Sequence, residues 1–86
     1  MNINELNLII EKKISQSISC QNIVIEDKTY LHLNHKSHEK NKFHIKLAIK
    51  SAELSKMKKI DATKKIYKIL EYELKNYIHS IQLEFN

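Results

Sequence analysis

Glycine and proline are both absent from all 86 residues of this chain. The P-loop, the dinucleotide-binding fingerprint and the GxxG clamp of a standard RNA-binding KH domain all require glycines, which let the backbone approach phosphate groups closely. A chain without glycine therefore contains none of these three motifs. Arginine is absent as well, and all 15 basic residues are lysine, which lacks the planar fork that contacts guanine or phosphate through two bonds. The net charge of +5 is therefore weak evidence for nucleic-acid binding.

The composition is that of a folded domain with one modest core. Hydrophobic residues make up 42% of the chain and charged residues 29%. No apolar run approaches the roughly 20 residues that a membrane span needs, and the N-terminus lacks the layout of a signal peptide. The single cysteine, Cys20, cannot form an internal disulfide. We therefore expect one soluble cytoplasmic domain over residues 1–86, without membrane association.

Hydrophobic periodicity predicts the order of the elements. Isoleucine and leucine at spacings of three and four predict an amphipathic helix near the N-terminus, while strict alternation from Phe43 predicts a half-buried strand. After Ser51 the period changes again, and Asp61 is a suitable N-cap for a second long helix. In chain order the sequence predicts a helix over 3–17, a strand over 23–30, a loop over 31–41, a strand over 43–50, a short helical turn over 54–57, a helix over 61–77 and a strand over 80–85.

This order predicts an α/β (α+β) fold. Two consecutive strands followed by a helical crossover to a third strand give a three-stranded mixed sheet, with both helices on one face. The apolar stripe of each helix should meet the apolar side of the strands. The residues expected to face inward are Leu6, Ile10, Ile14, Ile66, Tyr67, Leu70, Leu74 and Tyr77 on the helices, and Ile25, Ile45, Leu47, Ile81 and Leu83 on the strands.

Histidines are the side chains most suited to chemistry. His32, His35 and His38 are separated by two residues each in the polar loop, so their imidazoles could converge on a borderline metal ion. The alternative is a solvated loop whose histidines have no function. His79 begins the last strand and could face this loop, although strand alternation would place it, half-buried, on the side of Ile81. His44 is expected on the solvent face of its strand.

A lysine cluster surrounds the start of the second long helix. Its members are Lys56, Lys58, Lys59, Lys64, Lys65 and Lys68. The cluster could neutralise phosphates beside the helix N-terminus, or it could be an ordinary solvated face.

The sequence contains no recognisable catalytic arrangement, neither Ser-His-Asp nor Cys-His. Asp27 is expected to bond a loop backbone N–H, and Cys20 is expected to be a bystander thiol. We therefore do not expect an enzyme.

Taken in order, these motifs resemble the BolA family. Residues 25–35 carry an aspartate, a hydroxylated residue and then histidines, as that family's first strand and loop do. Residues 43–51 are similar to its second strand with a terminal serine, and residues 66–81 to its second helix with His79 at the start of the last strand. The resemblance implies a class II KH-like αββαβ fold, as one BolA-like domain over residues 1–86.

The resemblance also implies a partner and a cofactor. BolA-like proteins bind monothiol glutaredoxins in iron–sulfur cluster assembly, trafficking and iron homeostasis. The positions of His79 and His32 would each provide one ligand to a 2Fe–2S cluster, with His35 and His38 as alternatives to His32. The glutaredoxin cysteine and a glutathione thiol supply the other two ligands, so the cluster exists only in the complex. The chain alone is expected to be a monomer or weak homodimer.

Two other functions remain open. Some family members act as DNA-binding transcriptional regulators in stress responses, which here would use the lysine-rich face and bind DNA weakly. A protein-interaction adaptor without metal would use the surface near His79.

The sequence departs from the family pattern in three places. Lys42 stands where the family has a histidine, Lys56 stands where it has a glycine, and Ala62-Thr63-Lys64 stands where it has an Arg-His-Arg stretch.

Overall fold

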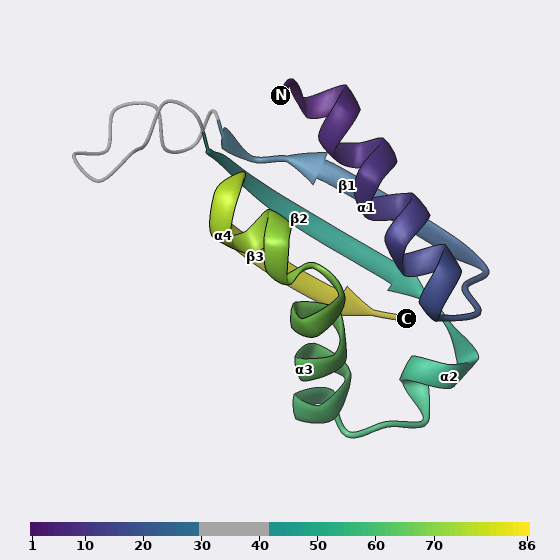
Figure 1. The fold of residues 1–86 in the computed structure, drawn as a ribbon. Helices are drawn as coiled ribbons and strands as arrows, with labels where there is room; N and C mark the ends of the chain where they lie inside the picture. Colours follow the sequence, from purple (N-terminus) through teal and green to yellow (C-terminus); the bar gives the residue numbers. More distant parts are fainter. Residues whose placement is uncertain (30–41) are drawn as a thin grey trace.

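The computed structural model describes residues 1–29 and 42–86 (Figure 1). The order of the elements confirms the predicted one, and the loop predicted over 31–41 lies outside the described residues. The elements are α1 (Ile3–Ser17), β1 (Asn22–Asp27), β2 (Phe43–Lys50), α2 (Ala52–Ser55), α3 (Lys59–Ile69), α4 (Glu71–Asn76) and β3 (Ile78–Phe85).

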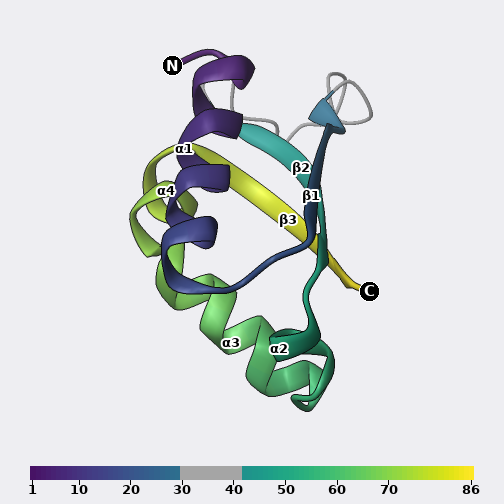
Figure 2. The same ribbon diagram turned by 90° about the vertical axis from the view of Figure 1, so that its right-hand side faces the viewer.

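The strands form one mixed sheet in the order β1-β2-β3, so β2 is central. β1 is antiparallel to β2, whereas β3 is parallel to it. A parallel neighbour requires a crossover connection, which the segment from α2 to α4 provides. Figure 2 shows α1, α3 and α4 together on one side of the sheet. The predicted three-stranded mixed sheet with its helices on one face is confirmed.

Helix α1 has the predicted bounds because its signals are local. The side chain of Asn2 accepts a hydrogen bond from the Glu5 backbone N–H at 2.9 Å and caps the helix. Leu6, Ile10 and Ile14 follow at spacings of four, and all three are fully buried. The buried hydrophobic residues of both helices and the sheet form a single cluster of Leu6, Ile10, Ile14, Ile18, Ile45, Leu47, Ile49, Leu54, Ala62, Ile66, Leu70 and Ile78.

The prediction of one continuous second helix over residues 61–77 is wrong in two respects. It starts at Lys59 with Lys58 as N-cap, and Asp61 lies in the first turn instead of capping it. It is also interrupted at Leu70, whose backbone angles (φ −99°, ψ 18°) separate α3 from α4. The predicted inward stripe nevertheless continues along both helices, because Ile66 and Leu70 are fully buried and Leu74 and Tyr77 pack against the core. Tyr67, expected inside, is 45% exposed.

The first strand ends three residues earlier than predicted. β1 ends at Asp27, whose carboxylate oxygen Oδ1 accepts hydrogen bonds from the backbone N–H of Thr29, at 3.0 Å, and from the Thr29 hydroxyl. The expected structural role of Asp27 is confirmed.

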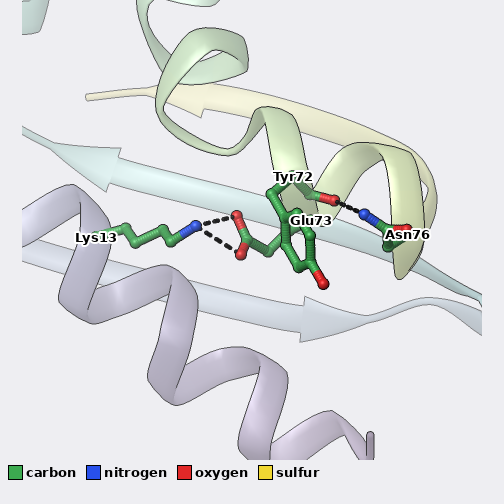
Figure 3. A network of polar contacts seen from close by, with 4 residues as sticks. All are labelled: Lys13, Tyr72, Glu73 and Asn76. Atoms are coloured by element: carbon green, nitrogen blue, oxygen red, sulfur yellow. Dashed lines mark hydrogen bonds and ion pairs between the residues drawn. The ribbon is translucent and has the colours of Figure 1, made fainter.

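An ion pair between the buried Glu73 and the partly exposed Lys13 joins α4 to α1, as Figure 3 shows. Both carboxylate oxygens of Glu73 accept hydrogen bonds from Lys13 Nζ, at 2.9 and 2.7 Å. Glu73 is only 2% exposed, and Lys13 Nζ lies 5.7 Å from the centre of the Tyr72 ring. Removing the partner of a carboxyl group buried in this way is strongly destabilising.

Candidate functional site

His79 lies at an irregularity in the pairing of β3 with β2. Phe43 of β2 is opposite Ile78, but the next residue, His44, is opposite Ser80, so His79 is one extra residue in β3. Such a β-bulge breaks the alternation of side chains and redirects the extra residue. Ile78 is 2% exposed within the core, whereas His79 is exposed. The expectation from strand alternation that His79 is half-buried in the core is therefore wrong.

His44, expected on the solvent face of its strand, is instead buried, with 5% of its surface exposed. Its ring centre lies 4.8 Å from that of His79, with the two rings inclined at 48°. Its Nδ1 lies 2.7 Å from the hydroxyl oxygen of Ser80. The expectation of exposure fails because the bulge brings His79 against the His44 ring. The sequence alone does not predict this contact between His44 and His79, because the two residues are far apart in the chain.

Backbone bonds bring the ends of the histidine-bearing segment to the same place. The His44 N–H donates to the Thr29 hydroxyl oxygen at 3.2 Å, and the His44 carbonyl accepts from the Lys28 N–H at 2.7 Å. The Phe43 N–H donates to the Tyr77 carbonyl at 2.8 Å. The segment over 30–41 thus leaves and rejoins the described chain at the end of the sheet where β3 begins. The loop candidates His32, His35 and His38 lie outside the described residues.

The described side chains alone do not make a complete metal centre. Within residues 1–29 and 42–86 there is no group of three or more histidine, cysteine or acidic side chains able to hold a metal ion. Burial raises the pKa of the Cys20 thiol, which disfavours the thiolate that a metal would bind. The exposed imidazole of His79 is a suitable nitrogen donor for iron. Any cluster at this position would need further donors from the loop or from a partner.

The lysine cluster lies on a different part of the molecule. It surrounds α2 and α3, beside a cavity of about 460 Å³ between these helices and the last residues of β3. Lys65 Nζ lies 2.6 Å from a carboxylate oxygen of Glu53, and this hydrogen bond lowers the pKa of Glu53. Asp61 adds a negative charge to the first turn of α3. The other members, Lys56, Lys58, Lys59, Lys64 and Lys68, are exposed.

No helix within the described ranges is long and apolar enough to cross a membrane.

The chain is similar to known proteins in both sequence and fold. It is 32% identical, over 75 residues, to a Haemophilus influenzae protein named DNA-binding transcriptional regulator BolA, a match that covers 87% of this chain and 70% of the relative. The BolA domain of SufE1 from Arabidopsis thaliana has a TM-score of 0.78 at 21% identity, covering 100% of this chain and 93% of that one. BolA1 from the same plant has a TM-score of 0.73 at 21% identity, covering 90% and 85%.

A family model extends this similarity over most of the sequence. The model described as BolA-like protein matches residues 14–86, which include every described strand and the whole of α2 to α4. BolA family proteins are non-enzymatic, in agreement with the expectation drawn from the sequence. The chain belongs to the family of BolA-like proteins.

Proposed function

We propose that this protein is a partner of a monothiol glutaredoxin and shares a bridging 2Fe–2S cluster with it, in cluster assembly and trafficking and in iron homeostasis. The observation that supports the proposal is the exposed imidazole of His79, set on a β-bulge at the end of the sheet from which the segment over 30–41 departs. That segment carries His32, His35 and His38. A ligand from the loop and one from β3 could therefore approach the same iron.

Each side contributes a different kind of ligand in this proposal. This chain offers neutral imidazole nitrogens from His79 and, first among the loop candidates, His32. The glutaredoxin cysteine and a glutathione thiol offer thiolates. Replacing thiolate by imidazole at one iron makes the cluster less negative and raises its reduction potential, as in Rieske centres. The cluster is the shared cargo of the pair, and the described residues of this chain do not suffice to hold it alone.

Mixing experiments test this function and separate it from the adaptor alternative. The protein is combined with a monothiol glutaredoxin and glutathione, with and without iron and sulfide, and each mixture is analysed by size and visible spectrum. We expect a heterodimer with one 2Fe–2S cluster and a spectrum unlike that of the glutaredoxin homodimer. A heterodimer of equal affinity with and without the cluster, and no new spectrum, would support the adaptor function instead.

DNA binding is the second candidate function, because the Haemophilus relative is named a DNA-binding transcriptional regulator. The exposed lysines around α3 are the surface that such binding would use. Two features oppose tight binding there, namely the pairing of Lys65 with Glu53 and the charge of Asp61 at the start of α3. We therefore rank this function below the cluster partnership.

The affinity for duplex DNA is expected to be weak and to collapse as salt rises. Lysine–phosphate contacts act through counterion release, so the logarithm of the binding constant should fall with the logarithm of salt by about 0.9 for each phosphate neutralised. The double variant Lys64→Ala/Lys65→Ala should reduce this slope, whereas the control Lys12→Ala/Lys75→Ala, on α1 and α4, should not. A sequence preference above about tenfold at physiological salt, lost in the first variant only, would favour the regulator function.

A further inference from the structure

We propose that His44 is a positioning residue for His79. Its buried ring, fixed through Ser80, restrains the exposed imidazole of His79 in the orientation used for ligation. The inference rests on the proposed function and deepens it, because it assigns a role to a residue that would touch neither the iron nor the glutaredoxin.

The backbone of His44 is held by two hydrogen bonds on the side of β1. His44 belongs to the central strand, with β1 on one side and β3 on the other. Its carbonyl accepts the Lys28 N–H at 2.7 Å, and its N–H donates to the Thr29 hydroxyl oxygen at 3.2 Å. A side chain attached at this point starts from a fixed position, unlike one on a loop.

The ring of His44 is fixed as well. It is 5% exposed, and its Nδ1 lies 2.7 Å from Ser80 Oγ, a distance at which the hydroxyl donates to, or accepts from, the ring nitrogen according to the tautomer. This hydrogen bond fixes the rotation of the His44 ring about the χ2 torsion angle. It also ties β2 to the residue that directly follows His79. The buried ring and the bulge are therefore one connected unit.

His79 is the exposed member of the pair. An exposed histidine loses rotamer freedom when it becomes a ligand, and that loss opposes binding. The centre of the His44 ring lies 4.8 Å from that of the His79 ring, within the usual range of contact between aromatic rings. The contact removes part of the freedom before any cluster arrives. Direct ligation by His44 is disfavoured, because its ring is buried and Nδ1 already contacts Ser80.

Two substitutions of His44 separate positioning from simple packing. His44→Ala removes the ring, whereas His44→Phe keeps a ring against His79. In the protein without iron, NMR relaxation of the His79 ring should show the greatest mobility in His44→Ala and a smaller increase in His44→Phe, which keeps a ring but cannot bond to Ser80. With glutaredoxin, glutathione, iron and sulfide, His44→Ala should weaken the cluster-bridged complex about tenfold, the usual effect of losing a group that orients a metal ligand. His44→Phe should recover only part of that loss, because its ring packs against His79 without the bond to Ser80.

Ser80→Ala keeps the test decisive if His44→Ala does not fold. Ser80 is exposed, so its hydroxyl can be removed without opening the core, and the variant should also loosen the His79 ring. Unchanged His79 mobility and unchanged complex affinity in Ser80→Ala and in a folded His44→Ala would overturn the proposal. Failure of the proposed function is recognised separately, because His79→Ala would then leave the spectrum of the mixed complex unaltered, while the NMR measurement needs no cluster.

Discussion

Replacing Lys13 with methionine is expected to lower the free energy of unfolding by about 3 kcal/mol, the cost of leaving a buried charge without its partner. Glu73 itself is unchanged in the variant, at a position where only 2% of the residue is exposed. Methionine preserves most of the aliphatic length of lysine, so the loss reflects the charge and its two hydrogen bonds to Glu73. Urea unfolding followed by circular dichroism measures the change.

The reverse substitution should cost less. In Glu73→Met the lysine is left alone, but its side chain is 38% exposed and can return its ammonium group to water. The double variant Lys13→Met/Glu73→Met should recover most of the loss, because an apolar pair often replaces a buried ion pair without penalty. Lys12→Met, at the neighbouring exposed position, is the control and should change stability by less than about 0.5 kcal/mol. Equal losses in the two single variants would contradict this account of Glu73.

Elements whose signals are local could be predicted from the sequence. Helix α1 has its cap at Asn2 and three buried residues at spacings of four, and both of its predicted ends are confirmed. Strand β2 has its predicted bounds and alternates from Ile45 to Lys50 as expected, whereas His44 departs from the pattern. The crossover that makes β3 parallel to β2 follows from element order alone.

Features that depend on distant contacts could not be predicted. The break at Leu70 occurs within a continuous helical pattern, and it turns α4 so that Glu73 meets Lys13, 60 residues away. A charged residue on an amphipathic helix is ordinarily assigned to the solvent side. The family resemblance pointed to His79, but neither its exposure nor its contact with His44 can be deduced from alternation, because one extra residue in β3 reverses the pattern.

His79→Ala is expected to abolish the spectral difference between the mixed complex and the glutaredoxin homodimer, because an imidazole nitrogen is lost from the cluster. His32→Ala should weaken the difference, or leave it intact if His35 or His38 can substitute. Acid should act in the same direction. Imidazole must be neutral to bind a metal, so the complex should be weaker at pH 5.5 than at pH 8. Gln82→Ala, at an exposed position further along β3, is a suitable control.

Isotope labelling locates the ligands most directly. The protein is labelled with ¹⁵N-histidine, combined with unlabelled glutaredoxin, glutathione, iron and sulfide, and the reduced cluster is examined by pulsed electron paramagnetic resonance. We predict ¹⁵N hyperfine couplings from this chain's histidines, with the strongest lost in His79→Ala and retained in Gln82→Ala. A cluster-containing complex without any ¹⁵N coupling, or with couplings that His79→Ala leaves unchanged, would contradict the assignment of His79 as the ligand from β3.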